Sequence, residues 1–165
     1  MSQIITIKSR IKDGGNRSKQ LRRMANSVNT VWNFCNEASC EMLKKYSKWL
    51  SYYDLSKLTS GSGKDLEINS QIVQQVCKEF ATRRSQFKKK KLSWRVSRGS
   101  RRSLGWIPCT NQNVKLSEGY FKLSGKTYRF WEKRELPGEV KSISLNEDAL
   151  GHWFINVREG TGRCN

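Results

Sequence analysis

The chain has 165 residues and a formal net charge of +18, which comes from 32 Lys and Arg against 14 Asp and Glu. Only 36% of the residues are hydrophobic, yet six Trp, six Phe and five Tyr suffice for the core of one ordinary domain, or of a small domain with an insertion. The charge favours a polyanionic partner, and the lack of a long apolar run argues against a membrane span or membrane partner. Since the N-terminus lacks the pattern of a secretory signal, we expect a cytoplasmic protein.

The first part of the chain predicts one strand followed by a long helix. Residues 4–11 are rich in β-branched side chains that partly alternate, and the turn sequence 13–15 ends them. From about residue 18 to residue 49, apolar side chains recur mostly at intervals of three and four, the period of an amphipathic helix. A strand that stands alone ahead of helices must pair later in the chain, because its backbone groups otherwise lack partners.

Two further helices are expected before the middle of the chain. Ser51 and Asp54 have the spacing of a capping box, which predicts a short helix that stops before residues 61–63. That Gly-Ser-Gly tract is typical of a flexible loop. Asn69 or Ser70 can cap the next helix, one face of which carries Val73, Cys77, Phe80, Arg84 and Phe87.

Residues 83–102 give the strongest functional signal in the sequence. They hold ten cations and no acid, with Phe87 and Trp94 among the cations and Trp106 shortly after them. Cations attract phosphates and release counterions, and flat aromatic faces stack on bases. We predict nucleic-acid binding by Arg83, Arg84, Lys88, Lys89, Lys90, Lys91, Trp94, Arg95, Arg98, Arg101, Arg102 and Trp106. Two plainer interpretations stay open: a solvated basic loop for the segment, and a core position for Trp106.

The rest of the sequence predicts about five short strands, a number typical of a small barrel or sandwich. Turns with Gly, Pro or Asp separate them, and they span residues 113–116, 120–123, 126–131, 139–145 and 152–158. Together with residues 4–11 they predict an α+β fold in which a small β-barrel is interrupted by a helical insertion. Four tryptophans that follow helix or strand periodicity are predicted to be core residues: Trp32, Trp49, Trp131 and Trp153.

The remaining residues that could carry chemistry point to no catalytic site, metal or cofactor. The five cysteines include no Cys-x-x-Cys pair, so we expect reduced, mostly buried thiols. His152 is the one histidine, and no cysteine or carboxylate neighbours it in the strand-like run, so it is expected to be an ordinary strand residue. The four aspartates are scattered among turns and helix starts, whereas two-metal cleavage needs clustered carboxylates.

Residues 92–108 read Leu-Ser-Trp-Arg-Val-Ser-Arg-Gly-Ser-Arg-Arg-Ser-Leu-Gly-Trp-Ile-Pro. This phrase resembles the TnpB family, RNA-guided nucleases that insertion sequences encode and that are related to miniature type V CRISPR effectors. The resemblance continues through the strand pattern of residues 115–131 and through residues 148–156, which are similar to the family's Gly-x-Trp-Tyr-Val strand. It also includes the helical residues 74–87, so it covers nearly all of the chain, and residues 100–108 are its most specific part.

The resemblance implies a wedge domain, an oligonucleotide-binding-like β-barrel built from the first strand and the C-terminal strands, with an inserted helical recognition domain. The implied limits are 1–12 for the first wedge strand, 13–98 for the helical insertion and 99–165 for the rest of the barrel. In the family these domains hold a structured guide RNA and read a short motif in the duplex beside the target. The positions that would read the motif are Tyr52 or Tyr53, Gln74, and Thr110 with Asn111, while Ser70 and Gln71 occupy neighbouring reader positions but differ in type from the family.

In the family the last strand leads into a RuvC-like nuclease domain with three acidic metal ligands and a zinc ribbon, and this sequence ends at residue 165 without them. We therefore predict a non-catalytic guide-RNA-binding protein, equivalent to the wedge and recognition half of a TnpB-like nuclease. Its expected role is that of a regulator, decoy or inhibitor of an RNA-guided nuclease from a CRISPR system or a transposon.

Three alternatives stay open. The chain could be one subunit of a split RNA-guided DNA endonuclease whose RuvC half is another protein, or a truncated fragment without a selected role. It could also be a duplex-DNA-binding factor whose third helix enters a major groove, where Gln74, Gln75, Lys78, Arg83 and Arg84 would serve it.

Overall fold

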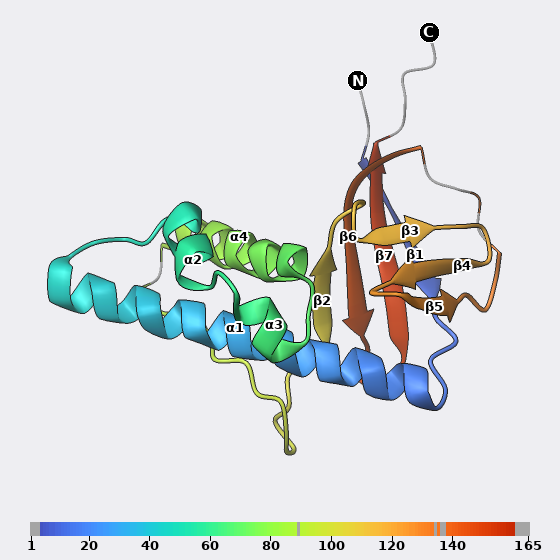
Figure 1. Ribbon diagram of the computed structural model, residues 1–165, viewed down its shortest axis with the longest axis horizontal. Coiled ribbons are helices and arrows are strands. Elements are labelled where there is room, and N and C mark those ends of the chain that lie inside the picture. Colours follow the sequence, from blue (N-terminus) through green and yellow to red (C-terminus); the bar gives the residue numbers. More distant parts are fainter. Residues whose placement is uncertain (1–3, 89, 134, 136–137, 161–165) are drawn as a thin grey trace, which may run out of the picture. The chain divides into compact units, whose positions relative to one another are not determined.

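The computed structural model describes residues 4–88, 90–133, 135 and 138–160, which divide into two compact units (Figure 1). The sheet unit combines residues 1–23 with 104–165, and the helical unit consists of residues 24–103. The first division lies inside a continuous helix, and the second lies just after the basic residues. The boundaries between these units, after residues 23 and 103, differ from the domain limits that the resemblance implies, after residues 12 and 98. The implied limits stay predictions.

The described part of the sheet unit contains seven strands in two antiparallel sheets (Figure 1). They are β1 (Ile4–Arg10), β2 (Trp106–Cys109), β3 (Val114–Leu116), β4 (Tyr120–Leu123), β5 (Lys126–Arg129), β6 (Glu139–Glu147) and β7 (Trp153–Gly160). One sheet has the order β1-β7-β6-β2 and the other has the order β3-β4-β5. The N-terminal strand therefore pairs with the last strand of the chain, as its isolation ahead of the helices predicts.

The predicted α+β class and the antiparallel sheets are confirmed, but the described strands do not close into a barrel. An isolated bridge between Ile11 and Phe130 links the two sheets. β2 is the edge strand beyond β6, and Pro108 in its middle has no backbone N–H to donate to a further strand. The same proline weakens the strand pattern in the sequence, which is why residues 106–109 are missing from the predicted strands.

The core of the sheet unit lies on one side of the four-stranded sheet, where Ile107, Leu145, Trp153 and Ile155 are buried. Trp153 is thus a core residue, as predicted. Gly105 passes so close to it that an added Cβ would lie 2.3 Å from an indole carbon, so no larger residue fits there without movement. Trp131 is a correction: β5 ends at Arg129 and the indole of Trp131 is 59% exposed.

The helical unit is built from most of α1 (Asn16–Tyr46), α2 (Tyr52–Leu58), α3 (Ser62–Leu66) and α4 (Ser70–Phe87). Both predicted caps are confirmed, since Ser51 and Asp54 form a capping box and Asn69 accepts from the N–H of Gln71. No helix of the described residues is long and apolar enough to cross a membrane.

Side chains of α1 and α4 form the core of the helical unit. Trp32 meets Phe80 edge-on with ring centroids 5.3 Å apart, and the burial of Trp32 agrees with the prediction. The predicted core position of Trp49 is wrong, because this residue lies beyond the end of α1 and is 48% exposed. Phe87, a candidate aromatic contact for bases, is the last residue of α4 and is also exposed. Helix periodicity overestimates burial near helix ends, where neighbouring elements cover the apolar side chain only in part.

The tract 61–63 is not a loop but the start of the short helix α3, which corrects the prediction from its Gly-Ser-Gly composition. Ser62 Oγ donates to the carbonyl of Thr59 at 2.7 Å, and Gly61 has a φ of +84°, which glycine adopts without strain. Gly63 is buried, and a Cβ there would lie 2.7 Å from the carbonyl oxygen of Ile68. The two glycines therefore serve a turn and a close backbone contact rather than flexibility.

The described cysteines are free thiols, in agreement with the expectation from their spacing, and Cys164 lies outside the described residues. Cys35, Cys77 and Cys109 are buried, and Cys40 is half-buried. The sulfurs of Cys35 and Cys77 lie 3.8 Å apart between α1 and α4. This contact lowers the pKa of Cys77 to about 7, and the same contact together with burial raises the pKa of Cys35.

Candidate nucleic-acid interface

The basic segment, residues 83–102, begins in the last turn of α4 and continues as an extended chain along α1 in the helical unit. Asn33 and Asn36 of α1 hold this chain by its backbone. The amide of Asn36 donates to the carbonyl of Leu92 at 2.7 Å and accepts from its N–H at 3.0 Å. Asn33 makes the same pair of hydrogen bonds with Arg95, both at 2.8 Å. Each asparagine amide thus replaces a neighbouring strand for one residue of the segment.

Two further side chains of α1 extend this anchorage. Asn29 donates to Ser97 Oγ at 3.1 Å and accepts from Nε of Arg95 at 2.6 Å. Trp32 Nε1 donates to the carbonyl of Ser93 at 3.2 Å. We call Asn29, Asn33 and Asn36 the asparagine ladder. Because the ladder fixes the backbone of residues 92–97, the segment is not a freely solvated loop.

A tight turn follows the extended part and places two arginines outward. The N–H of Ser103 donates to the carbonyl of Val96 at 2.8 Å, and Ser103 Oγ accepts from the N–H of Val96 at 2.9 Å. Gly99 has a φ of +91° inside this turn, which favours glycine. Arg98 and Arg101 are both exposed at its tip.

A groove of about 280 Å³ runs beside the anchored chain, and it combines aromatic rings with guanidinium groups. Trp94 and Phe87 are 50% and 62% exposed. Arg83 lies 5.7 Å from the ring centroid of Trp32 and pairs with Glu79 at 3.0 Å. The groove is lined by Trp32, Arg83, Phe87, Leu92, Ser93, Trp94, Arg95 and Ser103. Such a lining can receive the flat face of a base or sugar while the cations approach its phosphate.

Most of the other predicted phosphate contacts are accessible. Lys88, Lys90, Lys91, Arg98 and Arg101 are exposed, Arg95 and Arg102 are half-buried, and Lys89 lies outside the described residues. Burial and the neighbouring charge of Arg83 lower the pKa of Arg95. A phosphate placed between these two guanidinium groups would relieve their repulsion.

Arg84 is a correction among the predicted phosphate contacts, because its side chain is directed into the helical unit and is only 5% exposed. Its guanidinium donates to Ser39 Oγ at 2.5 Å and to the carbonyl of Leu50. Trp49 and Phe80 pack against it, with centroids 5.4 and 5.7 Å from the guanidinium carbon. Burial lowers its pKa. Arg84 joins the end of α1 to α4 and is unavailable to a phosphate.

The predicted motif readers are divided between the two units. Ser70, Gln71 and Gln74 lie in the first turns of α4, and Tyr52 and Tyr53 begin α2 with ring centroids 5.4 Å apart. Thr110 and Asn111 follow β2 in the sheet unit. The N–H of Thr110 donates to Asn113 Oδ1 at 2.8 Å. Trp106 lies in β2 and therefore in the sheet unit, whereas Trp94 lies in the helical unit. Its side chain is half-buried.

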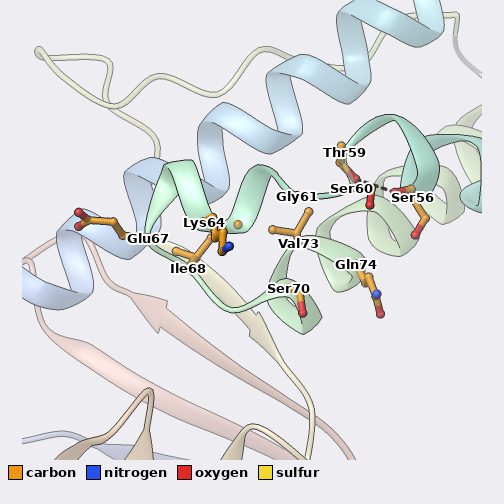
Figure 2. Close-up of a pocket in the computed structure, with 11 residues that line it drawn as sticks. Ser56, Thr59, Ser60, Gly61, Lys64, Glu67, Ile68, Ser70, Val73 and Gln74 are labelled. Carbon is orange, nitrogen blue, oxygen red and sulfur yellow. Dashed lines mark hydrogen bonds between the residues drawn. The ribbon is translucent and has the colours of Figure 1, made fainter.

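Ser70 and Gln74 line a cavity of about 490 Å³ between α2, α3 and α4 (Figure 2). Lys64, Ser56 and Ser60 contribute further polar side chains to its wall. Ser70 and Gln74 are both exposed on neighbouring turns of α4. The structure thus brings two of the predicted readers together beside a cation, whereas Tyr52 and Tyr53 do not line this cavity.

Three of the aspartates stabilise the fold through backbone hydrogen bonds. Asp13 Oδ2 accepts from the N–H of Trp153 at 2.8 Å, Asp54 closes the capping box of α2, and Asp148 Oδ1 accepts from the N–H groups of Leu150 and His152. The prediction for His152 is wrong, because this residue precedes β7 and its Nδ1 lies 3.5 Å from Asp148 Oδ2 in the same turn. In the part of the chain that the structure describes, no group of three or more His, Cys, Asp or Glu side chains could hold a metal ion.

The asparagine ladder is the feature that sequence reasoning missed. Its signal is present, because positions 29, 33 and 36 repeat at intervals of four and three and so share one face of a helix. Three amides on an inner face need partners, which predicts that another backbone segment covers them.

A scan against protein-family models finds no match to this sequence, and a search of curated proteins finds no match either.

Proposed function

We propose that this chain is a non-catalytic guide-RNA-binding protein, equivalent to the wedge and recognition half of a TnpB-like nuclease. The observation that carries the proposal is the asparagine ladder, which holds the basic segment extended with its cations outward. A segment ordered in advance loses less conformational entropy on binding than a free loop of equal charge. A flexible charged tail would not need such contacts, whereas here the buried amides of Asn29 and Asn36 hold the segment in one conformation.

A structured RNA fits this surface better than a bare polyanion does. The exposed cations supply contacts for phosphates, and the groove beside Trp94 and Phe87 supplies aromatic faces for an unpaired base. Guide RNAs combine the two features, because they contain helices and unpaired junctions. Stacking contributes about 1–3 kcal/mol per base where it occurs.

In this proposal the sheet unit corresponds to the oligonucleotide-binding-like wedge domain and the helical unit to the inserted recognition domain. The pairing of β1 with β7 supports the correspondence, because it brings together strands that flank the helices in sequence. The described strands are antiparallel, as in an oligonucleotide-binding fold, and the helices follow the first of them.

In the proposed role the protein binds a guide RNA and cleaves nothing. It thereby acts as a regulator, decoy or inhibitor of an intact RNA-guided nuclease. The structural tasks of Asp13, Asp54 and Asp148 support a non-catalytic chain, since each carboxylate already accepts backbone hydrogen bonds at the start of β7, at the start of α2 or in a turn. Binding without chemistry is sufficient for a competitor of a nuclease, because the RNA it holds is withdrawn from the active enzyme.

The test is to purify the full chain from its native cells at moderate salt and to sequence the RNA that accompanies it. One enriched structured RNA is expected, together with a fall in affinity of orders of magnitude as salt rises from about 50 to 200 mM. A heterogeneous RNA population, or an affinity that does not depend on salt, would contradict the proposal. A nuclease chain that co-purifies, and that cuts DNA only in the presence of this protein, would instead establish a split nuclease.

A second candidate function is contact of the helical unit with duplex DNA. The cavity that joins Ser70 and Gln74 to Lys64 favours it, because hydroxyl and amide groups bond base edges and a lysine neutralises a phosphate. The test compares a DNA duplex with a structured RNA of equal length at the same salt, for the wild type and for Gln74→Ala. A preference for the duplex that is lost in the variant would favour DNA recognition over RNA binding.

A further inference from the structure

The outer face of the four-stranded sheet, opposite its apolar core, is a second surface whose side chains suit nucleic-acid binding. Side chains alternate between the two faces of a strand, and on β1 and β7 the odd-numbered positions Ser9, Trp153, Ile155 and Val157 are buried. The even-numbered positions therefore share the outer face. On β1 they are Ile4, Thr6, Lys8 and Arg10, of which the last two are exposed cations.

Strand register arranges these outer residues in rows across the sheet. Arg10 pairs with Phe154, Phe154 pairs with Asn146, and Asn146 pairs with Trp106. The next row contains Lys8, Asn156, Ser144 and Pro108, and the third contains Thr6, Arg158 and Ser142. Two aromatic residues, three cations and several small polar side chains thus form one face.

Contacts between the side chains confirm that these residues share a face. Lys8 Nζ lies 4.2 Å from the ring centroid of Phe154. Asn156 Nδ2 donates to Asn146 Oδ1 at 2.8 Å, and Ser144 Oγ donates to the same oxygen at 2.8 Å. The amide of Asn146 is therefore fixed in orientation between Phe154 and Trp106.

The three rows described above contain no carboxylate. Glu147 is buried, where it accepts from the N–H of Gly105, and Glu159 belongs to the inner, odd-numbered series. The register shift between Val140 and Ser142 places Glu139 opposite Gly160, at the far end of the outer face, where it pairs with Lys141 at 2.8 Å. The single acidic side chain in the lining of the neighbouring cavity is Glu132, at its edge. The resulting charge on this face is positive.

An exposed tryptophan extends the face beyond β1. The N–H of Trp131 donates to the carbonyl of Arg10 at 3.1 Å, and both Arg10 and Lys12 lie within 5.7 Å of the Trp131 ring centroid. A cavity of about 520 Å³ opens here, with a lining of Lys8, Ser9, Arg10, Trp131, Glu132 and Phe154. Aromatic rings with cations above them, beside fixed amides, are the chemistry that stacks on bases and neutralises phosphates.

We propose that the outer face of β1-β7-β6-β2, together with Trp131, is a binding surface for single-stranded nucleic acid. Unpaired bases fit it because their faces are free to stack on Phe154 and Trp131, whereas the bases of a duplex are already stacked on each other. The charge complementarity of Lys8, Arg10 and Arg158 with a phosphate backbone selects a polynucleotide over an uncharged partner. The inference goes beyond the proposed function, because it uses none of the residues 83–102 and lies in the other unit.

Binding of the full chain to fluorescent oligouridine of about 12 nucleotides tests the inference, with oligothymidine and a blunt RNA duplex of equal length as comparison ligands. Lys8→Gln together with Phe154→Ala should weaken oligouridine binding about ten-fold or more. The matched control is Lys122→Gln with Tyr120→Ala on β4, which removes one exposed strand cation and one exposed aromatic ring outside the face. This control should bind as the wild type does. An equal loss in the control, or tighter binding of the duplex, would overturn the inference.

A third variant separates this inference from the proposed function. Lys90→Gln, Lys91→Gln and Trp94→Ala alter only the basic segment, so they should weaken structured RNA and leave most oligouridine binding intact. If they abolish oligouridine binding while the sheet variant has no effect, the sheet surface is wrong and the basic segment stands. If neither RNA binds the wild type, both proposals fail. Comparison of oligouridine with oligothymidine identifies RNA or DNA as the preferred strand.

Photocrosslinking supplies a readout that does not depend on a variant. Oligouridine that carries 5-iodouridine is irradiated with the wild-type chain, and the modified peptides are identified by mass spectrometry. Adducts at Phe154, Trp131 or Trp106 support the inference. Adducts confined to the peptides of residues 83–103 overturn it.

Discussion

The basic segment of the helical unit and the outer face of the sheet unit present similar chemistry but are ordered in opposite ways. In the segment, the cations follow one another along the chain, and the amides of Asn33 and Asn36 hold its backbone in place of a strand partner. On the sheet, Lys8, Phe154 and Trp106 come from distant parts of the sequence, and strand register brings them into one face.

This difference decides what each surface can tolerate. The segment depends on a few side-chain contacts, so loss of one asparagine should disorder several residues while their charge persists. The sheet face depends on the backbone ladder, so loss of one side chain should remove that contact and leave its neighbours in position. The two surfaces are therefore distinguishable by variants that separate charge from order.

The largest effect is expected when charge is removed from the basic segment. The change of Lys90, Lys91, Arg98 and Arg101 to Gln should weaken binding of a structured RNA about 10,000-fold at roughly 0.1 M salt, because each of the four phosphate contacts contributes about a factor of ten there. The slope of log K against log salt should also become shallower. Filter binding over a series of salt concentrations measures both quantities.

The matched control is a variant with the same net charge as the segment variant, but its four substitutions lie elsewhere in the helical unit. Lys44, Lys45, Lys48 and Lys57 are exposed, so their change to Gln removes four positive charges outside the segment. A loss of a few-fold is expected from the weaker overall field. An equal loss in both variants would show that total charge alone determines binding, and the ordered geometry of the segment would then have no role.

A smaller effect is expected when the order of the segment is removed and its charge is kept. Asn33→Ala and Asn36→Ala together should weaken RNA binding about ten-fold, since the released chain must be ordered again on binding. Each substitution leaves backbone groups of Arg95 or Leu92 without their partner, so each should lower the free energy of unfolding by about 1–3 kcal/mol. Binding assays and urea denaturation measure the two effects.

Limited trypsin digestion provides a direct measure of this order. Residues 83–102 carry ten cleavage sites, and cleavage there should be faster in the double variant than in the wild type. Asn26→Ala, on the same helix but outside the ladder, is the control and should leave the rate unchanged. Equal rates in the wild type and the double variant would mean that the ladder does not restrain the segment in solution.

Local patterns in the sequence predicted local structure well. The capping box of Ser51 and Asp54, the cap at Asn69 and the strand of residues 4–11 depend on neighbours within a few residues, and the structure has all three. The run of cations in residues 83–102 is equally visible, because charge is a property of composition. The wrong predictions of a core position for Trp49 and Trp131 share one cause: periodicity gives the face of an element but not the residue at which the packing against its neighbours ends.

Non-local pairing is what the sequence could not supply. The row from Arg10 through Phe154 and Asn146 to Trp106 exists only once three strand registers are known. Arg84 shows the same limit in part: its place on the apolar face of the helix is a local sign of burial, but its partners Ser39 and Leu50 are distant in sequence. The glycines of residues 61–63 are a different case: the approach of the Ile68 carbonyl to Gly63 is local, but glycine composition alone does not distinguish a close backbone contact from a flexible loop.

A third prediction introduces one negative charge into the row of Arg10, Phe154, Asn146 and Trp106, which contains no carboxylate. Asn146→Asp keeps an oxygen that accepts from Asn156 and Ser144, so the fold should be preserved. Binding of oligouridine should weaken about five-fold, because a new carboxylate repels phosphate by roughly 1 kcal/mol. The loss should shrink as salt rises. Binding of structured RNA through the basic segment is the internal control, and an equal loss there would mean that the two surfaces are not separate.

The smallest effect is expected at the cap of α2, which lies outside both surfaces. Ser51→Ala removes the hydroxyl that accepts from the N–H of Asp54, and it should lower the free energy of unfolding by about 1 kcal/mol without a change in RNA affinity at neutral pH. Urea denaturation and filter binding measure these two quantities on the same preparation. A loss of affinity would mean that partial unfolding of the helical unit accounts for some of the losses expected for the ladder variant.

The pH dependence of the Ser51–Asp54 cap of α2 provides a further control for the comparison of the two binding surfaces. Hydrogen bonds from the backbone and side chain of Ser51 lower the pKa of Asp54 below its usual value of 3.8. A carboxylate with a lowered pKa in the folded state stabilises the protein above its ordinary pKa, and this stabilisation is lost as the pH falls through the lowered value. The wild type should therefore lose stability in that acidic range more steeply than Asp54→Asn does, while the difference in stability between the two proteins stays constant between about pH 6 and 8. RNA affinities measured in this neutral range then report on the two surfaces and not on the cap.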